Sequence, residues 1–153
     1  GWVGLLLAFD DPEHSPLGYW GVEDAATAEL GYALWAAARG GLGAAEADDD
    51  GDGLSNLGEY ALGGNPVDAL DTGHAPVLKN ENGAMEYVHA FRADDGDLVY
   101  VLETTGDLVS GNWTNTGYAA VSTNWTGYAF GAITNTISTE KDRTFIRLVV
   151  EKP

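Results

Sequence analysis

The chain contains no cysteine and little positive charge. Its 153 residues include 24 aspartates and glutamates but only seven lysines and arginines, which gives a formal net charge of −17 at pH 7. Without cysteine the chain can form no disulfide, no thiolate metal site and no cysteine nucleophile. Because phosphate backbones and anionic lipids would repel so acidic a chain, we expect no nucleic-acid partner. Negative charge in this amount is expected to be neutralised by cations.

The sequence also lacks an apolar run long enough to cross a membrane. The run at its start, GWVGLLLAF, covers only residues 1–9, whereas a transmembrane helix needs about 20 apolar residues. No positively charged segment precedes this run, as a signal peptide would require. We therefore expect no membrane span, and we interpret residue 1 as the processed terminus of a secreted or cell-surface protein.

Composition divides the chain into three regions. Residues 1–22 are an apolar segment followed by a proline- and glycine-rich loop, residues 23–73 carry helical signals around an acidic loop, and residues 74–153 alternate like β-strands. We predict that residues 2–9 form one short strand. This strand either completes the chain's own sandwich or inserts as a donated strand into a neighbouring subunit or another extracellular protein.

Two helices are predicted in the second region. The first covers residues 25–39 and ends at a pair of glycines, and the second, shorter helix covers residues 54–62 and ends in the same way. The face of the first helix that we expect to be buried carries small and aliphatic residues, namely Leu30, Leu34 and either Ala37 or Ala38. The acidic loop thus lies between two helices.

The third region has the period-two alternation and the turn signals of antiparallel strands. Six segments rich in β-forming residues are separated by polar turns, and they cover residues 75–79, 84–91, 98–104, 117–123, 128–137 and 144–151. This pattern predicts an antiparallel β-sandwich of the immunoglobulin-like kind. We therefore expect a mainly β protein with a small α part, in which a helix-loop-helix is joined to the sandwich.

The acidic loop between the helices has the ligand spacing of an EF-hand calcium loop. In ADDDGDGLSNLGEY, residues 47–60, alternate aspartates are followed by a glycine that permits a sharp bend and then by a glutamate. The residues at loop positions 1, 3, 5, 7, 9 and 12 are Asp48, Asp50, Asp52, Leu54, Asn56 and Glu59. Leu54 would bind through its carbonyl and the others through side-chain oxygens. Hard oxygen ligands in this number suit calcium better than zinc or copper.

The alternative interpretation of the same residues is a solvated acidic turn. Chance agreement at every ligand position is small, and four converging carboxylates would repel one another without a cation, so we favour the calcium site. Asp49, Asp68 and Asp71 are candidates for binding a second ion, although NPVDALD is also the sequence of an ordinary turn with helix-capping aspartates.

The segment DDDGDGLSNLGEYALGGNP resembles the calcium loops of dockerin modules and thrombospondin type 3 repeats. It is most similar to a loop near the C-termini of secreted bacterial hydrolases such as sulfatases, where a tryptophan-containing helix precedes it, as LGYALWAAARGGL does here. Two later segments, YVLETTGDLVSGNW and RTFIRLVVE, are similar to the β-region that follows the loop in those proteins. The resemblance covers residues 27–153 and implies an extracellular, non-catalytic module that binds calcium through the six loop residues named above. Because only one complete loop is present, dockerin-like binding to cohesin is not expected.

No catalytic constellation is predicted. The three histidines, His14, His74 and His89, have no metal-ligand spacing, and the sequence contains neither a nucleophile elbow nor a glycine-rich phosphate loop. We therefore expect that the chain is not an enzyme.

Two kinds of surface residue have a predicted role. Trp125 and Tyr128 are candidates for stacking on the rings of a polysaccharide. Asn112 and Asn124 each begin an NWT sequon, which accepts an N-glycan where the source cell has the transferase. A glycan on either asparagine would make the nearby surface display sugar rather than bind it.

Two functions are consistent with these features. The first is a secreted, calcium-binding structural protein, a subunit of a fibre or surface layer that associates through residues 2–9. The second is an accessory module that attaches a secreted polysaccharide-degrading enzyme to glycan or to a cell surface. We favour the first, and we expect calcium as the bound ion in both.

Overall fold

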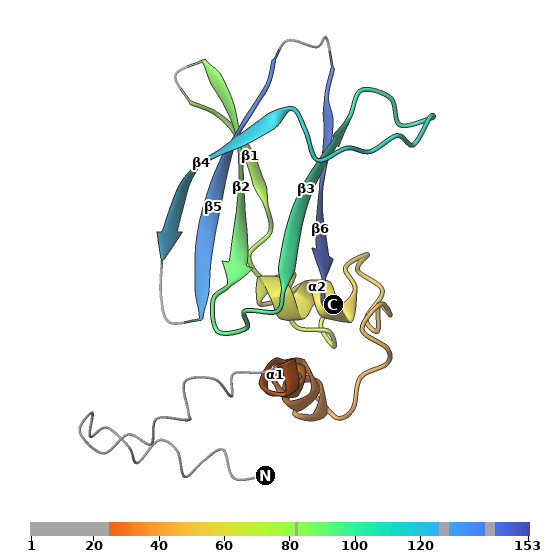
Figure 1. Ribbon diagram of the computed structural model, residues 1–153. Helices are drawn as coiled ribbons and strands as arrows, with labels where there is room; N and C mark the ends of the chain where they lie inside the picture. Colours follow the sequence, from red (N-terminus) through yellow and green to blue (C-terminus); the bar gives the residue numbers. More distant parts are fainter. Residues whose placement is uncertain (1–24, 82, 126–128, 140–142) are drawn as a thin grey trace, which may run out of the picture.

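A computed structural model describes residues 25–81, 83–125, 129–139 and 143–153, without the side chains of residues 25–30 and Trp125 (Figure 1). Its helices are α1 (Ala25–Ala37) and α2 (Asn56–Leu62). Its strands are β1 (Val77–Glu81), β2 (Ala84–Arg92), β3 (Val99–Thr105), β4 (Tyr118–Trp125), β5 (Phe130–Ile137) and β6 (Phe145–Glu151). The predicted mainly β class with a small α part is confirmed, and every strand lies within two residues of its predicted bounds.

The strands form two antiparallel sheets. One sheet has the order β1-β2-β5-β4, and the other pairs β3 with β6. β-Branched and aromatic residues fill these strands because their side chains pack well on a pleated surface. In β4 the register shifts between Ala120 and Ser122, so Val121 is the extra residue of a β-bulge.

The two sheets pack against each other through rings on β2 and β3. The ring centroids of His89 and Phe91 lie 6.0 Å and 6.5 Å from that of Tyr100. Figure 1 shows α2 at the lower ends of the sheets, where it contacts both β2 and β6. The buried cluster at this end of the molecule consists of Leu57, Tyr60, Ala61 and Leu98.

Arg92, the last residue of β2, holds α2 against the sheets. Its Nε donates a hydrogen bond of 2.7 Å to the carbonyl of Tyr60, and its guanidinium lies 4.2 Å from the centroid of the Tyr60 ring and 4.7 Å from that of Phe130. The hydroxyl of Tyr100 donates to the carbonyl of Ala61 (2.9 Å) and accepts from the backbone N–H of Arg92 (2.7 Å). Carbonyls in the last turn of a helix lack hydrogen-bond partners within the helix. In α2, residues of the sheets donate these hydrogen bonds instead.

A second polar contact of α2 is buried beside the first. The hydroxyl of Tyr60 donates to Oδ2 of Asp95 (2.8 Å), and Nζ of Lys152 lies 3.1 Å from the same oxygen. The side chain of Asp95 is only 1% exposed, so these two donors replace its hydration. Burial and the bond to Asp95 raise the pKa of Tyr60, which keeps its hydroxyl protonated as a donor.

The buried face of α1 differs from the predicted one. Leu34 is 65% exposed and Ala37 is also exposed, whereas Tyr32 and Trp35 are half-buried. Both rings pack on Tyr60 of α2, at centroid distances of 5.4 Å and 5.2 Å. Aromatic rings bury more apolar area than leucine, and residues three apart share a helix face, so this pair sets the orientation of α1.

The two helices are short. α1 has 13 residues and α2 has seven, and no helix in the described part of the chain is long and apolar enough to span a membrane. The strand predicted at residues 2–9 lies outside the described residues, so its pairing stays a prediction.

We predict that Arg92→Ala lowers the free energy of unfolding by about 2–3 kcal/mol. The substitution removes the charged hydrogen-bond donor of the buried Tyr60 carbonyl and the cation–π contacts with the rings of Tyr60 and Phe130. Arg147→Ala is the matched control. Arg147 pairs with Glu103 at 2.7 Å and lies 4.3 Å from the centroid of the Trp113 ring, but its side chain is half exposed and it holds no buried carbonyl. Its loss should therefore cost about 1 kcal/mol or less. Urea unfolding compares the two variants, and equal losses would contradict the role given to Arg92.

Candidate metal centre

The loop between α1 and α2 is shaped by its own aspartates. Asp48 accepts hydrogen bonds from the backbone N–H groups of Gly51 (2.7 Å) and Gly53 (2.9 Å), one on each carboxylate oxygen. Asp50 and Asp52 each accept one from the N–H two residues further on, at 3.2 Å and 2.6 Å. Gly51 and Gly53 have positive φ angles of 79° and 97°, which glycine adopts without strain, so the chain can bend around the carboxylates.

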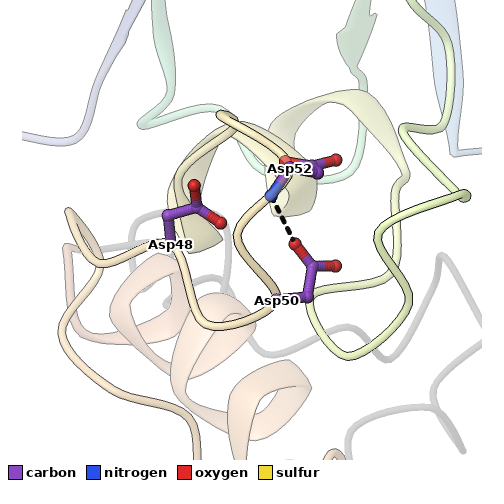
Figure 2. A group of neighbouring side chains, drawn as sticks. All are labelled: Asp48, Asp50 and Asp52. Atoms are coloured by element: carbon purple, nitrogen blue, oxygen red, sulfur yellow. Dashed lines mark hydrogen bonds between the residues drawn. The ribbon is translucent and has the colours of Figure 1, made fainter.

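This bend gathers three carboxylates at one place (Figure 2). Asp48, Asp50 and Asp52 each offer an oxygen, and the three oxygens lie within 4.8 Å of one another. In the described residues no second group of three or more histidine, aspartate or glutamate side chains is gathered as closely. Three like charges at these distances repel one another, and a cation between them would remove the repulsion. The cluster could therefore hold a metal ion.

Glu59 supplies a fourth carboxylate from the first turn of α2. Ser55 begins this helix as its N-cap and accepts a hydrogen bond from the N–H of Gly58 (3.2 Å). Glu59 is 0% exposed, and neither of its carboxylate oxygens has a hydrogen-bond partner. Burial, together with the negative charges of the three clustered aspartates and of Asp71, raises the pKa of Glu59 to about 7.

Five buried oxygens at this site have no hydrogen-bond donor. They are Oδ2 of Asp50, Oδ2 of Asp52, Oδ1 of Asn56 and both carboxylate oxygens of Glu59. Among the described residues only one other buried side-chain atom, the hydroxyl of Tyr32, has no partner. Such oxygens are costly when left alone, but they are the groups that coordinate a cation. The residues present thus fit a metal ion bound through oxygen.

Asn56 is oriented by the chain around it. Asn56 is 0% exposed, and its side-chain amide donates to the carbonyl of Ala44 (3.0 Å). Its Oδ1 is then the side-chain atom without a hydrogen-bond partner. Its backbone N–H donates to Ala47 (2.7 Å), and the N–H of Leu57 donates to Ala45 (2.8 Å). These bonds close the acidic loop at its base. These bonds could not be predicted from the sequence, because the backbone carbonyls of alanines carry no side-chain signal.

The other predicted ligands differ in whether their oxygens already accept hydrogen bonds. The carbonyl of Leu54 accepts no backbone hydrogen bond from the described residues, as a free ligand should. Both oxygens of Asp48 already accept backbone N–H groups, so coordination would use their remaining lone pairs. The carboxylate oxygens of Glu59 do not belong to the group of aspartate oxygens that lie within 4.8 Å of one another. The negative charges of these aspartates nevertheless help to raise the pKa of Glu59.

The residues predicted for a second ion are not gathered into a cluster of their own in the described part of the chain. Asp49 accepts a hydrogen bond from the N–H of Gly43 (2.8 Å). Asp68 and Asp71 each accept one from the N–H two residues further on, at 3.2 Å and 3.3 Å, as aspartates in turns commonly do. Asp71 also adds negative charge near Glu59. A second ion stays a prediction.

Three of the four residues predicted to carry or bind sugar lie on β4 or in the loop before it. Asn112, in the loop between β3 and β4, and Asn124, on β4, are both exposed. Trp125 belongs to β4, but its side chain is outside the described ones, and Tyr128 is wholly outside them. Glycosylation and contact with a polysaccharide therefore stay predictions.

Comparison of the chain with protein-family models, with curated proteins and with solved structures found no match. The likeness of the loop to dockerin and thrombospondin type 3 loops thus stays a prediction from its residues.

We predict that Glu59→Gln raises the free energy of unfolding by about 1–3 kcal/mol at pH 8 in the presence of a chelator. The substitution removes a buried charge close to other carboxylates and keeps the size of the side chain. Urea unfolding in EDTA measures this effect. Glu86→Gln, which affects a surface pair with Lys79, is the control and should destabilise by about 1 kcal/mol or less. A destabilised Glu59→Gln protein would show that the carboxylate has a stabilising partner within the chain, contrary to our assignment.

Proposed function

We propose that this protein is a secreted, non-catalytic structural protein that binds calcium and serves as a subunit of an extracellular assembly such as a fibre or surface layer. The observation that carries the proposal is the fully buried carboxylate of Glu59, which has no donor and lies in the field of three clustered aspartates. A folded protein keeps such a group only if its charge is neutralised, and a bound cation both neutralises and coordinates it.

Calcium suits this donor set better than other biological cations. All candidate ligands are oxygens, which are contributed by Asp48, Asp50, Asp52, Leu54, Asn56 and Glu59. About six to eight oxygens in a flexible arrangement are the usual coordination of calcium, whereas magnesium demands a stricter octahedron and keeps several waters. Zinc prefers nitrogen and sulfur ligands, and the chain contains no cysteine.

The ion would join two parts of the protein. The clustered aspartates belong to the loop after α1, whereas Glu59 and Asn56 belong to α2. α2 in turn is fixed to the sheets by Arg92 and Tyr100. Calcium should therefore order the loop and the helix pair against the sandwich, which is the action of a structural ion.

The described histidines support a non-catalytic role. His89 is 4% exposed, its Nδ1 donates to the carbonyl of Ala90 (2.9 Å), and burial lowers its pKa, so the ring is neutral and enclosed. His74 packs on the ring of Phe130 at a centroid distance of 5.0 Å. Neither histidine belongs to a metal-ligating group in the described residues. Both rings are used in packing.

An extracellular setting suits such a site. EF-hand-type sites of extracellular modules bind calcium with dissociation constants of about 10⁻⁴–10⁻³ M, which extracellular calcium can fill. The absence of cysteine is compatible with export from a bacterium, and the apolar segment at residues 2–9 supports association between copies.

Titration calorimetry should detect saturable binding of calcium, and calcium should raise the melting temperature above its value in EDTA. At about 100 times the dissociation constant the stabilisation is about 2.7 kcal/mol. Asp48→Ala and Glu59→Ala should each abolish it, whereas Glu81→Ala, at the exposed end of β1, should leave it unchanged. A wild-type melting temperature that ignores both calcium and EDTA would contradict the calcium site.

Electron microscopy tests the assembly. The calcium-loaded chain should form oligomers or filaments, and these should dissolve on chelation, because loss of the ion restores like-charge repulsion in a chain with a net charge of −17. Monomers under both conditions would contradict the role as a subunit.

A further inference from the structure

β4 forms one outer edge of the larger sheet, and β1 forms the other. In Figure 1, β4 lies at the left margin of the sheet with β5 on its inner side. Among the described residues the backbone of residues 119–125 has no hydrogen-bonded neighbour other than β5. The side chains of residues 119–124 are all exposed. No described residue thus pairs with the outer row of N–H and C=O groups on β4, and this row can accept another strand.

β4 is also the only outer strand without a charged side chain in the described sheets. Its sequence is YAAVSTNW, with neither proline nor glycine. The other outer strands all carry charge: Lys79 and Glu81 on β1, Glu103 on β3, and Arg147 and Glu151 on β6. Natural proteins commonly protect their sheet edges with charges or proline. On β4 such protection is limited to the bulge at Val121.

This distribution of charge indicates which partner fits the edge. Two copies of a chain with a net charge of −17 repel wherever their carboxylates meet, and like charges placed directly opposite each other weaken strand pairing. Two copies can pair along β4 without placing carboxylates opposite each other, because β4 itself carries none. The longest stretch with regular register is Ser122–Trp125, which follows the bulge.

We propose that β4 pairs antiparallel with β4 of a second copy about a two-fold axis at Thr123, so that the two larger sheets become continuous. In this register the two copies of Thr123 lie opposite each other, and Ser122 lies opposite Asn124. Main-chain hydrogen bonds supply the contact, and the absence of charge permits it between two acidic subunits. This inference rests on the proposed role as a subunit and names a surface through which copies associate.

Charge-swap variants of Thr123, the exposed residue at this axis, test the pairing. In a two-fold contact Thr123→Glu places two carboxylates near each other, and Thr123→Lys places two ammonium groups near each other. Each variant alone should associate at least about tenfold more weakly than the wild type, and an equimolar mixture of the two should regain the association. Asn80→Glu and Asn80→Lys, on the opposite edge strand β1, are the matched controls and should associate like the wild type.

The measurement is sedimentation equilibrium of the full chain in saturating calcium. The chain is produced in a host without N-glycosylation, so that Asn124 carries no glycan, and circular dichroism verifies that each variant is folded. If the wild type associates and the Thr123 variants associate equally well, the β4 contact is overturned while the subunit role stands. Variants that lose association without recovery in the mixture would also overturn pairing of β4 with β4. A monomeric wild type would overturn both this contact and the subunit role.

Discussion

A buried carboxylate without a hydrogen-bond donor is the constraint on which this end of the molecule depends. Glu59 is held at 0% exposure because its neighbours on α2, Tyr60 and Ala61, form the core against the sheets. The helix cannot turn Glu59 toward solvent without giving up that core. The charge of Glu59 must therefore be neutralised where it lies. Either a proton neutralises it, which the pKa of about 7 permits, or a cation bound to the neighbouring aspartates does.

The same short helix connects the acidic loop to the sandwich. Its first turn carries Asn56 and Glu59, and carbonyls of its last turn accept hydrogen bonds from Arg92 and Tyr100. A helix of only seven residues thus carries both a part of the candidate ion site and the junction with the sheets. An ion that orders the loop would therefore stabilise the packing of the whole described chain, and this is the property expected of a structural module.

Local signals made the strands and the acidic loop predictable. Alternation and turn residues located every strand within two residues. The spacing of aspartates and glycine predicted a sharp bend in the acidic loop, and Gly53 makes it with a φ angle of 97°. The buried face of α1 was not predictable, because it depends on a partner from another helix. Tyr32 and Trp35 pack on Tyr60, whereas helical spacing alone favoured a face of leucine and alanine. The burial of Glu59 also depends on how α2 docks. The sequence predicted Glu59 as a ligand but could not indicate that its carboxylate lacks any donor.

A crystal structure of the calcium-loaded protein, with anomalous data, tests the central claim most directly. We expect a calcium ion bonded to Glu59 and to the clustered aspartates, at oxygen distances of about 2.3–2.6 Å. An anomalous map without a peak at this loop in saturating calcium, or an ion bound with Glu59 left uncoordinated, would contradict the claim.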